Sequence, residues 1–249
     1  MTLKSVLAGA STALLLSAGL ATASPVRIDA ASVVGTFSAS FEVTAVNVTR
    51  VDRDESRATV SNFENALAEA QDPLNDTFGD GDEGFAFDTF LYSGPVRFGT
   101  DGGASTTIGN FLNTGVSNGG VLTDLDPTFA SLTNSAGGID QTPGVATTTF
   151  YLFRALAADF SAGLFDIAHD DGVRIPGLPG VAGPITETGT RIAFGGGPLA
   201  FLYVSSNSDP SVFRVDSSVR PVPLPAGIWM LLVGAGAFGL LARRRKAAA

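Results

Sequence analysis

The sequence predicts an all-β domain built as an antiparallel β-sandwich of the jelly-roll kind, with one short helix. Apolar residues recur in short alternating runs, best seen in Thr36–Val43, where every second side chain from Phe37 onward is apolar. A period of two places one face of a strand in a core and the other in solvent. Many short strands between frequent turns are typical of a sandwich. The turn signals lie at Gly94-Pro95, Asp101-Gly102-Gly103, Gly119-Gly120, Gly137-Gly138, Pro143-Gly144 and Pro176–Gly183.

Six further segments have the composition and the alternation of strands. Directly after Thr36–Val43, the apolar residues Val46 and Val48 continue out of phase, which predicts a β-bulge or a turn near Ala45. The later segments are therefore expected to complete the two sheets of the sandwich. They are Phe85–Leu91, Thr147–Phe153, Leu164–Ala168, Arg191–Phe194, Leu199–Val204 and Val212–Val215.

The predicted helix begins at a capping box. Ser61 is expected to cap its N-terminus, and Glu64 stands three residues later. A narrow apolar face follows, and Asp72-Pro73 ends the run, so the helix is expected to cover an end or an edge of a sheet. A second, weaker helical pattern occupies Ile108–Thr114.

The N-terminal residues 1–23 have the features of a secretory signal peptide. Lys4 supplies a short positive region, Val6–Leu20 is mostly apolar, and Ala21-Thr22-Ala23 fits a cleavage site with small residues. We therefore predict that the mature chain begins at Ser24. The alternative is an uncleaved membrane helix, which the small-residue site and the absence of strong basic flanks disfavour.

The C-terminal residues 221–249 contain a second targeting signal. The run Val222-Pro223-Leu224-Pro225-Ala226 leads into an apolar segment. From Leu224 to Ala242 there are roughly 19 uncharged residues, which as a helix would rise about 28 Å against a hydrocarbon core of about 30 Å. Arg243, Arg244, Arg245 and Lys246 follow, and by the positive-inside rule they favour the cytoplasmic side. An ordinary single-pass anchor has the same features. The pentapeptide, short helix and Arg cluster together resemble the VPLPA variant of the PEP-CTERM sorting signals, a resemblance that implies recognition and cleavage by a membrane-embedded exosortase.

Between these ends, residues 24–220 are predicted to form an extracytoplasmic domain. The chain has 24 acidic and 15 basic residues, and five of the basic residues lie in the two targeting segments. The remaining acidity disfavours nucleic acid and anionic lipid as partners, because counterion release at phosphates needs Lys and Arg. There is no cysteine, so disulfides, thiolate metal sites and cysteine nucleophiles are excluded.

The main candidate site is the adjacent pair Asp170 and Asp171, which stands between the strand-like segments Phe165–Ala168 and Val173–Ile175. Two neighbouring carboxylates repel each other unless a cation or hydrogen-bond donors hold them, and Ca²⁺ prefers oxygen ligands. We therefore predict a calcium site at this pair. The alternative is that Asp-Asp-Gly simply makes a good hairpin turn between two strands.

The order of strand, small-residue turn, strand, Asp-Asp-Gly and strand, followed by two late strands with Tyr203, resembles the protective-antigen-type β-sandwich module of microbial adhesins. The resemblance covers roughly residues 147–216. It implies that Asp170 and Asp171 bind calcium and that the calcium helps to hold a sugar. This chain departs from the family pattern after Gly172, where Val173-Arg174-Ile175 leads into a loop rich in Pro and Gly, so the resemblance assigns no sugar-contacting loop.

Other polar segments carry weaker signals. The loop Asp72–Gly84 is rich in Asp and fits either calcium or a solvated turn, but its spacing is not that of an EF-hand. His169 is the single histidine, and no Ser or Thr nucleophile is marked for it. Gly195-Gly196-Gly197 lacks the Lys and Ser or Thr of a phosphate loop. Paired carboxylates for glycoside hydrolysis stay open, because a separation of about 5 to 9 Å in space leaves no sequence signature.

These observations predict an exported, surface-directed and non-catalytic protein. Its expected role is that of an adhesin-like or extracellular-matrix component, with calcium as the cofactor and polysaccharide as a partner. Two alternatives remain: a carbohydrate-active hydrolase, and a purely structural matrix protein that binds no small ligand.

Overall fold

The structure is a computed structural model that describes residues 35–52, 54–74, 78–79, 81, 83–100, 106–134, 146–180, 188–206 and 211–223. The predicted signal peptide, the C-terminal apolar segment and the Arg cluster lie outside these residues, and of the sorting pentapeptide only Val222 and Pro223 lie within them. Over the described ranges, no helix has the length and apolar character needed to cross a membrane.

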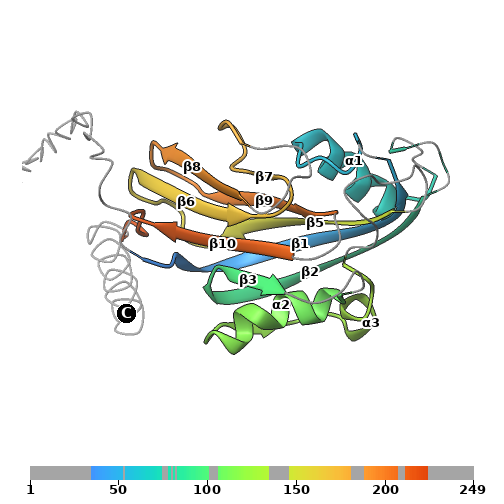
Figure 1. Cartoon of the computed structure of the whole chain (residues 1–249), viewed down its shortest axis with the longest axis horizontal. Helices are drawn as coiled ribbons and strands as arrows, with labels where there is room; N and C mark the ends of the chain where they lie inside the picture. Colours follow the sequence, from blue (N-terminus) through green and yellow to red (C-terminus); the bar gives the residue numbers. More distant parts are fainter. Residues whose placement is uncertain are drawn as a thin grey trace, which may run out of the picture.

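The described residues form an antiparallel β-sandwich of two sheets, which confirms the predicted fold class (Figure 1). One sheet has six strands in the order β4 (Val121–Thr123), β2 (Gly84–Pro95), β1 (Ser38–Val51), β5 (Ala146–Ala155), β9 (Ala200–Ser205) and β7 (Val173–Arg174). The other sheet has four, in the order β3 (Arg97–Thr100), β10 (Ser211–Ser217), β6 (Gly163–His169) and β8 (Thr188–Phe194).

Every predicted strand segment is found in a strand of the sandwich. The sequence reading missed β3 and β4, which have four and three residues and lie at sheet edges. Strands of this length are too short to show alternation, because two or three positions do not define a period.

The predicted bulge near Ala45 is wrong. β1 pairs with β2 without interruption from Ser38 to Thr49, and its register shifts against β5 only between Thr49 and Val51. The alternation of apolar residues changes along β1 because this part of the strand is buried on both faces. Val43 and Ala45 lie in the core between the sheets, whereas Val46 and Val48 lie in a second apolar cluster on the outer face.

Helix α1 (Val60–Gln71) covers that second cluster (Figure 1). Phe63 and Ala66 are its buried apolar residues and pack with Val46 and Val48. The prediction that Ser61 caps the helix is wrong, because Thr59 has the extended backbone of an N-cap and its hydroxyl accepts the Asn62 N–H at 3.1 Å. The predicted end of the helix at Asp72 is confirmed.

Helix α2 (Ile108–Ser117) confirms the second helical pattern, and α3 (Pro127–Ala130) was not foreseen, so the expectation of one short helix is wrong. α2 contacts β3 of one sheet and β4 of the other, and it therefore closes one open side of the sandwich (Figure 1). Phe111 of α2 stacks on Tyr203 of β9 with ring centroids 5.8 Å apart.

A substitution at Gly115 tests the packing of α2 against the core, because the helix lies close to the core at this residue. A Cβ at Gly115 would collide with the Phe98 ring and would lie 2.8 Å from the Tyr92 hydroxyl oxygen. We expect Gly115→Ala to lower the melting temperature, although alanine in a helix interior is intrinsically favoured over glycine by about 1 kcal/mol. Asn113→Ala on the exposed face of the same helix is the matched control and should leave the melting temperature unchanged or slightly higher. A stabilised Gly115→Ala protein would contradict this packing.

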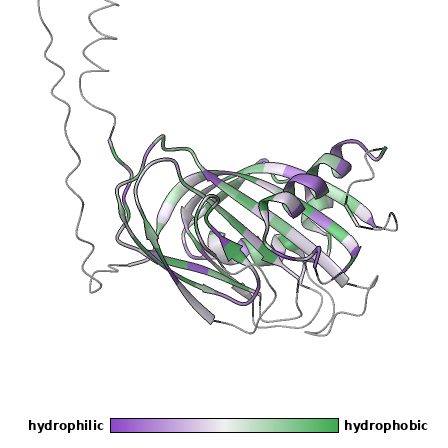
Figure 2. Cartoon of the chain, turned by 90° about the horizontal axis from the view of Figure 1, so that it is seen from above, coloured by the Kyte–Doolittle hydropathy of each residue, from purple (hydrophilic) through white to green (hydrophobic). Residues whose placement is uncertain are grey.

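The core between the sheets is dominated by aromatic rings. Phe213 of β10 stacks on Tyr203 of β9 with centroids 4.9 Å apart and also contacts Phe153 of β5 at 5.5 Å. These rings lie in both sheets and hold the two layers together. Figure 2 shows the corresponding hydrophobic stretches along the strands of the sandwich.

Candidate functional site

The Asp170-Asp171-Gly172 segment connects the two sheets. β6 ends at His169 in the four-stranded sheet, whereas β7 pairs with β9 in the six-stranded sheet, with Val173 opposite Tyr203. The expectation that a simple hairpin turn joins two neighbouring strands is therefore wrong. A strand does follow at Val173, but the chain crosses from one layer to the other to reach it.

Asp170 lies inside the protein at this crossing, with 2% of its surface exposed. Its Oδ1 atom accepts hydrogen bonds from the Tyr203 hydroxyl at 2.7 Å and from the Val212 N–H at 2.8 Å. Its Oδ2 atom is buried and has no hydrogen-bond partner among the residues that the structure describes. Burial raises the pKa of Asp170 to about 6, because a carboxylate is poorly solvated in this position.

Asp171 is fully buried and is bound by the end of β9. The Ser206 N–H donates to Oδ2 at 2.7 Å, and the Ser206 hydroxyl donates to Oδ1 at 3.4 Å. The Val204 N–H donates to the carbonyl oxygen of Gly172 at 2.9 Å. The two carboxylates therefore have different partners: Asp170 is held by Tyr203 of β9 and Val212 of β10, and Asp171 is held by Ser206, the residue after β9.

His169 is a structural part of the same turn. Its Nδ1 atom lies 2.6 Å from the carbonyl oxygen of Asp171, and its Nε2 atom lies 2.7 Å from the Thr190 hydroxyl. Since a carbonyl oxygen only accepts, Nδ1 carries a hydrogen, and the neutral ring accepts at Nε2 from Thr190. Burial lowers the pKa of His169 and so favours this neutral form. Both ring nitrogens are therefore engaged in bonds within the fold.

A buried polar network adjoins the turn, and sequence reasoning missed it. The Ser205 and Ser211 hydroxyls lie 3.1 Å apart, and the Asn134 side chain donates to Ser205 at 2.9 Å. Asn134 also accepts from the Tyr151 hydroxyl, and its carbonyl oxygen accepts from Thr149 at 3.0 Å. No sequence signal marks Asn134, which stands in an ordinary polar stretch, although none of its surface is exposed.

The acidic loop after α1 is only partly described, since Asp76, Asp80 and Asp82 lie outside the described residues. In the described part, Asp72 forms the C-cap of α1, and Glu83 accepts the Gly81 N–H at 3.0 Å. Over the ranges that the structure describes, no group of three or more His, Cys, Asp or Glu side chains is placed to hold a metal ion.

The Asp170-Asp171 pair nevertheless has the chemistry that Ca²⁺ prefers. Calcium takes six to eight oxygen ligands in flexible geometry and accepts carboxylates and main-chain carbonyls. Within the described part of the chain, Asp170 Oδ2 is a buried carboxylate oxygen without a hydrogen-bond partner, so a cation bound there would offset its uncompensated charge. The carboxylates of Asp170 and Asp171 would hold such an ion, and their other bonds fix them in place.

Comparisons with known proteins identify no family. No family model and no curated protein matches the chain. Two solved structures are similar at a low level. The PA14 domain of the MpAFP antifreeze protein is 12% identical, with a TM-score of 0.35 over 75% of this chain and 85% of that one. A PA14 sugar-binding domain from an RTX adhesin is 11% identical, with a TM-score of 0.31 over 72% of this chain and 89% of that one.

Proposed function

We propose that this chain is an exported, non-catalytic surface protein whose domain binds a glycan through a calcium ion at Asp170 and Asp171. The observation that carries the proposal is the buried Oδ2 atom of Asp170, which no donor of the described residues satisfies. A buried carboxylate oxygen without a hydrogen bond costs stability, and buried carboxyls with a raised pKa cluster at functional sites.

Each neighbouring residue has a defined part in this proposal. Tyr203 and the Val212 N–H hold Asp170 by one oxygen, which keeps the second oxygen oriented for a cation. Ser206 holds Asp171 and ties the end of β9 to the turn. A bound calcium ion would supply coordination positions for sugar hydroxyls. The extracellular-matrix role follows from this binding and from the predicted export.

The same contacts favour a second candidate, a purely structural matrix protein. The Asp170 and Asp171 bonds join β6, β9 and β10, so the pair connects the two sheets even without a ligand. Hydrolase activity is less well supported, because the Asp171 carboxylate and both nitrogens of His169 are engaged within the fold.

A glycan array probed with and without chelator separates the binding protein from the structural one. On neutral glycans, we expect binding in millimolar calcium, loss of binding in EDTA, and loss in Asp171→Asn under both conditions. Asp159→Asn, at an exposed residue between β5 and β6, is the matched control and should bind as the unmodified protein does. Binding of neutral glycans that is indifferent to EDTA would contradict the calcium role, and the absence of any glycan signal would favour the structural protein.

We further propose that the chain is routed by its C-terminal signal, with an exosortase-type enzyme and the membrane as its partners there. Within the described residues, the Val222 N–H donates to the Asp159 carbonyl oxygen at 2.9 Å, and the Val222 side chain is 47% exposed. The pentapeptide that starts at Val222 therefore begins at an exposed residue that is still hydrogen-bonded to the domain.

Processing at this signal predicts a shortened mature protein. In the native host, surface or released material should lack residues from Trp229 to Ala249, as intact-mass analysis can establish. Replacing Arg243, Arg244 and Arg245 by Ala should reduce membrane retention of the precursor, because the cytoplasmic charge anchor is lost. A mature mass that still includes the Arg cluster would contradict the sorting proposal.

A further inference from the structure

The outer face of the four-stranded sheet has an unusual arrangement of charges. Arg97 of β3 lies directly opposite Arg214 of β10, and Asp216 of β10 lies directly opposite Asp166 of β6. Like charges in opposed cross-strand positions are unfavourable. The sheet thus sets an arginine pair beside an aspartate pair, and only part of this charge is neutralised within the fold.

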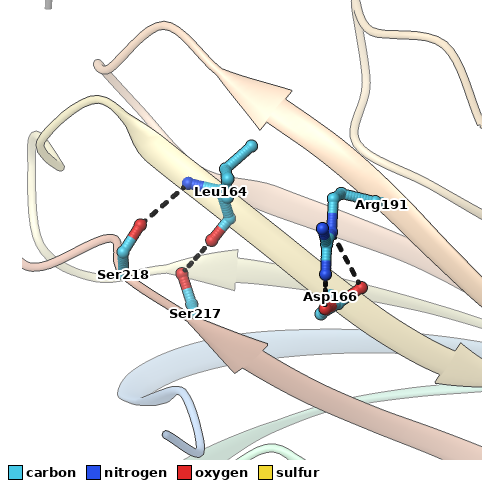
Figure 3. Close-up of polar contacts among 5 residues, drawn as sticks. All are labelled: Leu164, Asp166, Arg191, Ser217 and Ser218. Carbon is cyan, nitrogen blue, oxygen red and sulfur yellow. Dashed lines mark hydrogen bonds and ion pairs between the residues drawn. The ribbon is translucent and has the colours of Figure 1, made fainter. Parts of the chain in front are cut away.

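Of the two aspartates, Asp166 is the one whose charge is neutralised within the fold. Arg191 of β8 lies opposite it and forms an ion pair, with Nη2 at 2.5 Å from Oδ2 and Nε at 3.4 Å from Oδ1 (Figure 3). This bond occupies both oxygens of Asp166, so its charge is not available to the neighbouring arginines of β3 and β10.

The two opposed arginines lack such a partner among the described residues. Arg97 donates one hydrogen bond, from Nη1 to the neutral Thr36 hydroxyl at 3.2 Å. Arg214 extends over Gly99 of β3, where its Nη2 atom lies 2.9 Å from the position of a Cβ on that glycine. Over the described ranges, its guanidinium forms no ion pair or hydrogen bond.

These side chains border a depression in the sheet surface. Its volume is about 350 Å³, and Ala168 and Gly189, which are opposite each other on β6 and β8, leave its floor without bulky side chains. This volume is at the lower end of the range for small-molecule sites. Arg97 and Arg214 form one wall, and Asp166 and Asp216 form another.

We propose that this depression binds the carboxylate of an acidic sugar residue, with Arg97 and Arg214 on the carboxylate and Asp216 on the sugar hydroxyls. A planar guanidinium matches a carboxylate with two parallel hydrogen bonds. The neighbouring aspartates disfavour a dianion such as phosphate by repulsion, and they favour a singly charged acid that carries hydroxyl donors. The site is distinct from the Asp170-Asp171 turn and needs no metal ion, so it does not depend on the proposed calcium role.

The test uses the full-length chain in detergent with EDTA present, titrated calorimetrically with a galacturonic acid trimer. The methyl-esterified trimer is the matched ligand, because it keeps the hydroxyls and lacks the charge. We expect saturable binding of the acid, and at least about tenfold weaker binding of the ester and of Arg214→Gln or Arg97→Gln, from the loss of a charge-assisted hydrogen bond.

Arg154→Gln is the control variant. Arg154 is an exposed arginine on β5 of the other sheet, 3.9 Å from Glu42, and its substitution should leave the affinity unchanged. Equal affinity of the acid and its ester, full affinity in Arg214→Gln, or no saturable binding in EDTA would each overturn the proposal. Calcium-dependent glycan binding could fail or succeed without changing any of these outcomes.

Discussion

Phe213→Ala is expected to lower the free energy of unfolding by about 3–5 kcal/mol, the range for removing a fully buried phenylalanine. None of the Phe213 surface is exposed. Its ring contacts Tyr203 at 4.9 Å and Phe201 at 5.9 Å across the sandwich, measured between ring centroids. The substitution would leave a cavity between the two sheets, and the chain has no disulfide to limit the loss.

Urea denaturation followed by fluorescence and circular dichroism measures this change. The control is Phe87→Ala, since Phe87 lies on the outer face of β2 with 41% of its surface exposed and should change stability by less than about 1 kcal/mol. Similar losses at the two positions would contradict a core located between the sheets.

The second large effect concerns Asp170 in the metal-free protein. Its pKa is raised to about 6 in the folded state, against about 3.9 in an unfolded chain. Between these values the folded state binds more protons, so this carboxyl makes the protein less stable as the pH rises from about 4 to about 6. Two pKa units correspond to about 3 kcal/mol.

Asp170→Asn removes this titration and keeps a side-chain oxygen that can accept from Tyr203 and the Val212 N–H. In EDTA, the variant should therefore gain about 3 kcal/mol relative to the unmodified protein between pH 4 and pH 7. Using the difference between the two proteins cancels the contribution of His169, which both contain. A difference that does not change with pH would show that Asp170 is not a strained buried carboxyl.

Much of the fold could be predicted from the sequence because alternation reports burial on one face of a strand. The segment Thr36–Val43 was placed correctly for this reason. The prediction failed after Ala45, where α1 buries the second face as well, because burial by a distant element leaves no local signal. The prediction of Ser61 as the N-cap of α1 failed for a related reason. Thr59 and Ser61 are both suitable capping residues, and only the backbone geometry selects Thr59.

The site could be predicted only in part. Asp170 and Asp171 were found because adjacent acidic residues at a strand end are conspicuous. Their partners were not found, because Ser206 and the Val212 N–H lie about forty positions later in the chain, and a main-chain donor has no sequence signature. The cross-strand pairing of Arg97 with Arg214 was invisible for the same reason, since it depends on the register of β3 against β10.

The most direct test of the proposed calcium site is the melting temperature of the Ser24–Pro223 fragment, which retains the Val222 bond to Asp159, measured in calcium and in EDTA. A ligand that binds only the folded state at a hundredfold excess over its Kd stabilises it by about 2.7 kcal/mol. We expect a melting temperature that rises with millimolar calcium, falls with EDTA, responds weakly to magnesium, and is indifferent to calcium in Asp170→Asn. A melting temperature of the unmodified fragment that is the same in calcium and EDTA would contradict the calcium site.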